Sequence, residues 1–451
     1  MDVDLDPQVV QIQKYVDLIN SNSPEEMLEG TVGLRKILCI ERSPPYDQVF
    51  ATGVVPRLIT FLDPCAPQNL QFESCWCISN LASGTNAHTK EIVDRGALLP
   101  LIKLISSNNV DVAEQSTWAI GNIAGDSPKY RDEALYLGVL EPLVETAQKT
   151  NTVGILRRLS WTISNLCRGT PQPPLHMVLP CLGTLRNMVY IADDEVLIDS
   201  IWAVSYITSN NEGIQCIIDL GIVHRMIELM LSSNHSIMIP ALRTVGNIAS
   251  GNDTQTQTII NLGVLPILFS LFTHVKKNVR KEAYWTASNI ASGTVSQIQA
   301  LIDHGYFPEL LRIFDDPVTD ITLLREIGWT ISNASNGSSA QVAYFVQIGF
   351  IKSIASFLKR QTTPKDVLIF LEALHNILHS GSTFDTGNPY LGVCESEGIP
   401  TILSDLVLRC AEKLDVFEKI HTILDSFFFD SSMMEDELQE TVEATFEALS
   451  M

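Results

Sequence analysis

The chain has 451 residues, whereas one compact domain usually has roughly 100 to 200, so several domains or one extended repeat array are required. Thirty Lys and Arg residues against 52 Asp and Glu residues give a net charge of −22, which disfavours nucleic acid and favours a cationic partner. No run approaches the ~18 apolar residues of a membrane span, and the acidic start MDVDLD is unlike a secretory signal. We therefore expect no nucleic-acid binding, no membrane and no export by that route.

The cysteines indicate a reducing compartment. Nine are present without a Cys-x-x-Cys pair, and most lie in apolar segments, as Cys39, Cys167 and Cys216 do. This pattern is typical of reduced packing residues, so we expect a protein of the cytosol or nucleus.

Along the chain, segments that open with Gly and continue with apolar residues return at a fixed distance. Their starts are 42 to 44 residues apart, except for one step of 83 residues that equals two periods. The distance indicates an internal repeat. In chain order the segments are GVVPRLITFL from Gly53, GALLPLIKLI from Gly96, GVLEPLVETA from Gly138, GIVHRMIELM from Gly221, GVLPILFSLF from Gly263, GYFPELLRIF from Gly305 and GFIKSIASFL from Gly349.

Each of these segments is followed by a polar break and then by a second apolar segment with a shared core. The cores are 41 to 44 residues apart, so two independent landmarks have one period. In chain order the cores are WCISN from Trp76, WAIGN from Trp118, WTISN from Trp161, WAVSY from Trp202, RTVGN from Arg243, WTASN from Trp285 and WTISN from Trp329.

Apolar residues within a unit recur at helical spacing, and Gly or Pro separates the pieces. Each unit is therefore predicted to be a short helix followed by two longer helices. A period of about 40 to 47 residues is typical of HEAT and armadillo arrays. Degenerate units fit around residues 37–47 and from residues 373–378 through 416–429. We predict an all-α, right-handed superhelical armadillo-repeat solenoid of about ten three-helix repeats.

Three regions are predicted from this reading. Residues 1–8 form an N-terminal extension, residues 9–429 form the solenoid, and residues 430–451 form a tail that contains seven acidic residues and no Lys or Arg. The tail is either a solvated end or a segment that binds a partner.

The repeated Trp and Asn residues are the main functional signal. All six tryptophans occupy one position of the repeat, and where the pair is complete Asn follows four residues later, on the same helix face. Asn amides can clamp the backbone of an extended peptide, and slots between parallel indole rings accept the stems and cations of Lys or Arg. Alternatively, each Trp packs in the core and each Asn caps or satisfies backbone within the stack.

The repeated Trp and Asn residues form a ladder along the stacked repeats. Carboxylates beside this ladder can bind the ammonium groups of such a peptide. Asp126 follows WAIGN, whereas Asp199, Glu282 and Glu326 each precede a Trp by three residues. Their common register with the ladder favours a binding role, although each can instead be a solvated surface carboxylate.

At these residues the chain closely resembles importin-α (karyopherin-α), from about residue 9 to residue 429. The resemblance implies a nuclear import adaptor that binds Lys/Arg-rich nuclear localisation signals of cargo proteins for delivery with importin-β. It also implies a nuclear export receptor and nucleoporins as partners, and shuttling between cytoplasm and nucleus through nuclear pores. Matching stretches are RSPPYDQV, LQFESCWCISNLASG, WAIGNIAGDS, SNLCRG, PALRTVGNIASGNDTQTQ, RKEAYWTASNIASG and the late NPY at Asn388.

The resemblance implies two cargo sites. In the family the Asp of the GNIAGD run receives the key lysine of the signal, a role that falls to Asp126. Arg243 replaces Trp and Tyr206 replaces Asn in the central repeats, as the family also has. The implied major site comprises Trp76, Asn80, Gly84, Thr89, Gln115, Trp118, Asn122, Asp126, Trp161 and Asn165. The implied minor site comprises Trp202, Arg243, Asn247, Asp253, Glu282, Trp285, Asn289, Glu326, Trp329 and Asn333.

One departure from the family concerns importin-β. The family begins with a basic importin-β-binding segment, and nothing before Val9 resembles it. Either the chain is truncated, which we favour, or the natural protein lacks the segment. We expect importin-β as a partner only if such a segment exists outside this chain.

The sequence disfavours two other functional classes, an enzyme and a scaffold for acidic ligands. For an enzyme, His375 and His379 have the spacing of a helical metal pair but no Glu after His375 and no third ligand, so we expect a surface or packing role, no metal site, no cofactor and no catalytic residues. An armadillo scaffold for another protein complex, of the kind that binds acidic ligands, needs a basic groove. The acidity of the chain disfavours that alternative.

Overall fold

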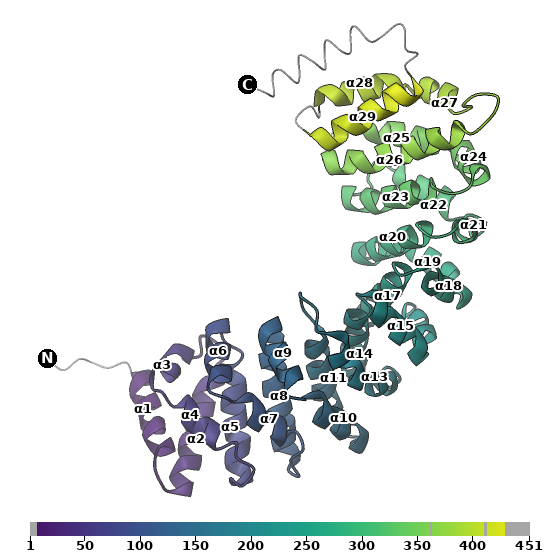
Figure 1. The fold of residues 1–451 in the computed structure, drawn as a ribbon. Helices are drawn as coiled ribbons and strands as arrows, with labels where there is room; N and C mark the ends of the chain where they lie inside the picture. Colours follow the sequence, from purple (N-terminus) through teal and green to yellow (C-terminus); the bar gives the residue numbers. More distant parts are fainter. Residues whose placement is uncertain (1–6, 361–362, 410–412, 429–451) are drawn as a thin grey trace, which may run out of the picture. The chain divides into compact units, whose positions relative to one another are not determined.

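The computed structural model describes residues 7–360, 363–409 and 413–428 (Figure 1). All secondary-structure elements of these residues are helices, and no strand occurs in the described ranges. They divide into two compact units, one formed within Met1–Met226 and Ser232–Thr244, the other within Ile227–Leu231 and Val245–Met451. The predicted acidic tail, residues 430–451, lies outside the described residues.

The first unit begins with a helix pair and continues with groups of three helices. The first helix starts at Pro7, before the expected start of the solenoid at residue 9. Its helices are α1 (Pro7–Ile19), α2 (Pro24–Leu38), α3 (Tyr46–Ala51), α4 (Val55–Thr60), α5 (Gln68–Leu81), α6 (Asn86–Asp94), α7 (Leu98–Leu104), α8 (Val110–Asp126), α9 (Pro128–Tyr136), α10 (Leu140–Lys149), α11 (Val153–Cys167), α12 (Leu175–Val178), the 3₁₀ helix η1 (Leu179–Cys181), α13 (Leu182–Met188), α14 (Asp194–Ile207) and α15 (Asn211–Leu220).

The second unit repeats the three-helix pattern. Helices α16 (Val223–Leu229) and α17 (His235–Ala249) contribute residues to both units. The remaining helices are α18 (Asp253–Asn261), α19 (Val264–Ser270), the 3₁₀ helix η2 (Leu271–Thr273), α20 (Lys277–Ala291), α21 (Val295–Asp303), α22 (Tyr306–Phe314), α23 (Ile321–Ala334), α24 (Ser339–Ile348), α25 (Phe350–Leu358), α26 (Pro364–Gly381), α27 (Leu391–Ser396), α28 (Ile399–Arg409) and α29 (Leu414–Phe427).

The three-helix groups confirm the predicted solenoid of armadillo type, but the helix lengths differ from expectation. In each group the first two helices have 4 to 11 residues and only the third has 14 to 18. Most of the second helices follow a Gly with positive φ, and each is separated from the third helix by a connecting segment. At Gly305, for example, φ is 75°, a backbone conformation that residues with a Cβ rarely adopt, and Asp320 then caps α23.

Within each unit the third helices pack side by side and form one continuous face. In the first unit α2, α5, α8, α11 and α14 each contact the next, and in the second unit α20, α23, α26 and α29 do so (Figure 1). Their apolar residues, such as Ile120, Ile163 and Ile331, are fully buried between neighbouring repeats. The opposite faces of the same helices carry the Trp and Asn residues, so stacking aligns these residues along each unit.

Candidate functional site

The tryptophans lie at equivalent places on the third helices. Trp76, Trp118, Trp161 and Trp202 are on α5, α8, α11 and α14, and the other two are on α20 and α23. Five are half-buried, and Trp329 is 44% exposed, so none is a fully buried core residue. The alternative of purely core tryptophans is therefore wrong.

Small residues in one repeat make room for the indole of the next. A Cβ at Gly121, three residues after Trp118, would lie only 2.2 Å from Cζ3 of Trp161. In the second unit a Cβ at Gly246 would lie 2.4 Å from Cζ3 of Trp285. Both distances are far shorter than any atomic contact allows. Each Gly therefore lets the indole of the next repeat pack directly against the helix backbone, which fixes the position of that ring.

The indole rings are less regular than expected. Trp118 and Trp161 have ring centroids 5.9 Å apart, but their planes are inclined by 51°, so the predicted parallel arrangement is wrong for this pair. The guanidinium carbon of Arg158 lies 3.4 Å from the Trp118 ring centroid. That of Arg35 lies 4.5 Å from the ring of Trp76. The chain's own cations thus already contact two indoles.

The Asn amides connect each repeat to the one before it. Asn122 Nδ2 donates to Ser79 O at 3.0 Å. The other amides donate in the same direction: Asn80 to Cys39 Sγ at 3.2 Å, Asn165 to Gly121 O at 3.2 Å, Asn289 to Gly246 O at 3.1 Å and Asn333 to Ser288 O at 2.9 Å. The interpretation that each Asn satisfies backbone within the stack is thus correct for the amide N–H of four of them, whereas Asn80 donates to a side-chain sulfur. The oxygens of these five amides accept no hydrogen bond from another described residue, and Asn165 is itself buried.

Asp126 is the last residue of α8 and is half-buried. Its Oδ2 accepts a hydrogen bond of 2.6 Å from Asn86 Nδ2, the first residue of α6. No Lys, Arg or His of the described ranges forms an ion pair with it. The negative end of the α8 dipole adds to the charge of this carboxylate, so the position attracts a cation.

Two other carboxylates near the tryptophans, Asp199 and Glu326, are desolvated by burial. Burial raises the pKa of Asp199 to about 6, with the nearby Glu195 adding to the shift. Burial also raises the pKa of Glu326, although Lys281, whose Nζ is 3.9 Å away, works in the opposite direction. Carboxylates in such surroundings gain most when a cation binds them.

The turn between α5 and α6 lies beside Asp126. Thr89 is fully buried, and its hydroxyl donates to Ala82 O at 3.3 Å, so it shapes this turn from beneath. His88 Nδ1 accepts from Thr85 N at 3.1 Å and completes the capping box of α6, and a Cβ at Gly84 would lie 2.4 Å from that nitrogen.

The structure divides the predicted sites between the units. All major-site residues belong to the first unit, where Gln115 lies one turn before Trp118 on α8 and is half-buried. Of the minor-site residues, Trp202 and Arg243 also belong to the first unit, and the rest belong to the second. Trp202 stacks on Tyr206 with centroids 5.7 Å apart. Those in the second unit are Asn247, Asp253, Glu282, Trp285, Asn289, Glu326, Trp329 and Asn333.

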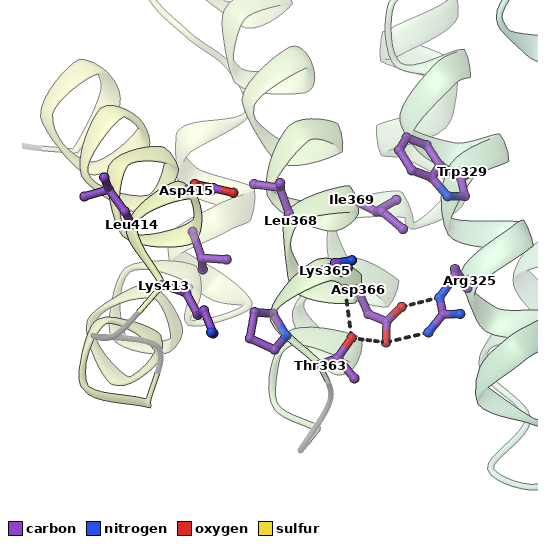
Figure 2. A pocket seen from close by; sticks show the side chains of 12 residues that line it. Arg325, Trp329, Thr363, Lys365, Asp366, Leu368, Ile369, Lys413, Leu414 and Asp415 are labelled. Atoms are coloured by element: carbon purple, nitrogen blue, oxygen red, sulfur yellow. Dashed lines mark hydrogen bonds and ion pairs between the residues drawn. The ribbon is translucent and has the colours of Figure 1, made fainter.

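A cavity of about 710 Å³ adjoins the exposed Trp329 and is lined by residues of α23, α26 and α29 (Figure 2). Leu368, Ile369 and Val416 supply an apolar floor. At its edge Arg325 binds the buried Asp366 through two N–H groups, which ties α23 to α26. Figure 2 shows the side chains of Arg325 and Asp366 directed toward each other, below the indole of Trp329 in this view.

Sequence reasoning missed Arg158, Asn86 and His88. Arg158 has a sequence signal, because it stands three residues before Trp161, where the repeats of Trp202, Trp285 and Trp329 have an acidic residue. His88 also has one, since Gln occupies the same capping position in later repeats, as Gln297 does. The Asn86 contact depends on the stacking of two repeats and has no local signal.

The residues of the rival hypotheses have packing contacts. His375 and His379 have parallel rings 6.2 Å apart, and His375 also meets Phe427 edge-on. Within the described ranges no three His, Cys, Asp or Glu side chains form a group that could hold a metal ion. No single described helix has the length and apolar character of a membrane span, although two bent helix pairs, α18 with α19–η2 and α24 with α25, reach these limits together.

Comparison with known proteins supports the armadillo assignment. The model of the Armadillo/beta-catenin-like repeat matches residues 42–83, 85–125, 210–250 and 252–292. An engineered protein of known crystal structure superposes with a TM-score of 0.82, covering 92% of this chain and 98% of that protein at 23% identity, which confirms the fold.

Named relatives are importin-α subunits. Importin subunit alpha-4 of Arabidopsis thaliana is 47% identical over 238 residues, covering 52% of this chain and 44% of the relative. Importin subunit alpha-B of Dictyostelium discoideum is 46% identical over 251 residues, covering 55% and 49%. Importin subunit alpha-1b of Oryza sativa subsp. japonica is 40% identical over 242 residues, covering 53% and 45%. The chain spans about half the length of the curated relatives it matches. The chain has an armadillo-repeat fold and is importin-α-like over about half of its length.

Proposed function

We propose that the protein is a nuclear import adaptor whose Trp- and Asn-bearing face binds the Lys/Arg-rich nuclear localisation signals of cargo proteins. The observation that carries the proposal is the regular row of partly exposed indoles and oriented Asn amides on successive third helices. The net charge of −22 favours a basic ligand over an acidic one.

The major site is the part of the proposal with the best chemical support. Asn122 is held by its N–H on Ser79, so its amide oxygen has a fixed direction toward an incoming backbone N–H. The carboxylate of Asp126, which forms no ion pair with a cation of the described residues, can receive a lysine ammonium group. The minor site, the movement between cytoplasm and nucleus, and importin-β, an export receptor and nucleoporins as partners rest on the resemblance to importin-α.

The proposal is tested by following Trp fluorescence while a Lys-rich signal peptide is added. We expect a saturable change, because the site contains indole rings that the peptide would cover. A peptide of the same length with Glu at the Lys positions should give no change at equal concentration.

A pair of Asn variants makes this test specific. Asn122→Ala should weaken the Lys-rich peptide by about 5-fold or more, since it removes amide contacts worth ~1 kcal/mol each. Asn187→Ala changes an exposed Asn on α13, which carries no predicted site residue, and should leave binding unchanged. Preferential binding of the acidic peptide, or equal effects of the two variants, would contradict the proposal.

A further inference from the structure

Arg158 breaks the charge pattern of the repeats. It lies on α11 three residues before Trp161 and therefore one turn below that indole. It is the only cation at this position among the repeats that carry a Trp. The equivalent residues of the others are Glu73, Gln115, Asp199, Glu282 and Glu326.

The guanidinium of Arg158 lies against the indole of the preceding repeat. Its carbon is 3.4 Å from the Trp118 ring centroid, the distance of direct stacking, and the rings of Trp118 and Trp161 are 5.9 Å apart. A ligand lysine in this slot would have to use the same indole face. The position that a bound cation would take is therefore already filled.

The donors of this guanidinium are uncommitted. No hydrogen bond or ion pair of Arg158 occurs within the described part of the chain, although Arg has five N–H donors. Burial lowers the pKa of Arg158, and the more distant carboxylates of Glu114 and Glu195 only partly offset that effect. A partly buried cation without an ion-pair partner would be stabilised by an anion that binds to it.

Two other arginines near Arg158 or near an indole differ from it, because their guanidinium groups form ion pairs. Arg35 also lies on an indole, but Glu73 holds its Nε at 2.7 Å. Arg157, the residue before Arg158, binds Asp193 at 2.8 Å and Glu195 at 2.9 Å. The ion pairs of these two arginines join neighbouring repeats, whereas among the described residues Arg158 is joined to the preceding repeat through the face of Trp118.

We propose that Arg158 fills the slot between Trp118 and Trp161, so that the peptide residue facing this slot is acidic rather than Lys or Arg. A Glu or Asp side chain can receive two parallel N–H bonds from the guanidinium. A Lys at the same place would meet a like charge and would have to displace Arg158 from the ring. The inference rests on the proposed function and adds a selectivity that a uniform basic site would not have.

Calorimetric titration of a Lys-rich peptide series, in which Glu replaces one residue at a time, tests the inference. For the unchanged protein, one position should favour Glu over Lys while the others favour Lys. For Arg158→Gln, that same position should favour Lys, and the affinity of the all-Lys peptide should rise between about 2-fold and 30-fold, the range of one cation–π contact.

Two further variants separate this effect from general changes of charge and folding. Arg158→Lys keeps the charge and should still disfavour Lys at the position. Lys103→Ala removes a charge on α7, which bears no predicted site residue, and should leave every preference unchanged. Thermal unfolding identifies any variant that is misfolded, and Arg158→Lys then carries the comparison.

The outcomes distinguish the two proposals. If no Lys-rich peptide binds the unchanged protein, the proposed function is wrong and the inference falls with it. If the peptides bind but Lys is favoured at every position, or if Arg158→Gln alters no position selectively, only the inference is overturned.

Discussion

Asp126 offers the sharpest test of where a basic peptide binds. Its Oδ2 is 2.6 Å from Asn86 Nδ2, it lies at the negative end of α8, and no cation of the described residues pairs with it. Replacing it with Asn keeps the side-chain shape and one acceptor oxygen for Asn86 but removes the negative charge and the second acceptor oxygen. Loss of a charge-assisted hydrogen bond costs roughly 1.5 to 3 kcal/mol, so we expect Asp126→Asn to weaken a Lys-rich peptide by at least about 10-fold.

Charge reversal at the same position should cost more. Asp126→Lys removes the attraction and places a like charge where the lysine ammonium would dock. Truncating one member of a buried charge pair costs about 2 to 5 kcal/mol, so the affinity should fall by about 30-fold or more. The order of affinities should be unchanged protein, then Asp126→Asn, then Asp126→Lys.

Calorimetry with a peptide that carries a single Lys-rich cluster measures these losses, and Glu326→Lys is the matched control. Glu326 is an acidic ladder residue of the other unit, beside Lys281, so its reversal should barely affect a peptide that occupies the major site. Unfolding curves check that both reversed proteins fold. Equal losses in the two, or no loss for Asp126→Lys, would refute the assignment of the major site.

Two further predictions concern other residues of this face. Gly121→Ala should destabilise the protein by about 1 to 3 kcal/mol, because the new Cβ would lie 2.2 Å from Trp161 Cζ3, and it should also lower peptide affinity; unchanged thermal unfolding would contradict the tight seat. Because the folded pKa of Asp199 is about 6, above its usual 3.8, its carboxylate is neutralised as pH falls through 6. Affinity for a peptide that contacts it should fall over that window in the unchanged protein but not in Asp199→Asn, and relative to that variant the unchanged protein should lose stability as pH rises from about 4 to about 6. Parallel pH profiles of the two would contradict this.

The repeat and its position were readable from sequence because they depend on local patterns. The distance between Gly305 and Gly349 indicates one period, and a Gly that must adopt positive φ marks the same turn in each repeat. The predicted lengths of the second helices were wrong, because only the third helix of each group is long. The break DDPVTD after GYFPELLRIF shows that the second helix ends, but only the capping of α23 by Asp320 shows where the third helix begins.

The candidate site was less predictable, because its details arise between repeats. The row of tryptophans follows from spacing alone, but the 51° inclination of Trp118 against Trp161 depends on how Gly121 and Arg158 fill the space between two helices. The choice of Asn86 as partner of Asp126 likewise joins residues 40 positions apart in the sequence. Such contacts are set by the register of the stack, which no single repeat encodes.

Five Asn amides of the row donate a hydrogen bond to the preceding repeat, so the orientation of each depends on two repeats. Asn333 owes its orientation to Ser288 O, 2.9 Å away, and Asn289 owes its own to Gly246 O, 3.1 Å away. If the contact between two repeats opens transiently, one Asn amide loses its orientation and the others keep theirs. The affinity for a peptide should therefore fall gradually as these contacts loosen. By the same geometry, duplication of one repeat would add one Asn whose amide is already oriented by the repeat before it. The length of peptide that the protein can bind could then grow by whole repeats without other changes to the site.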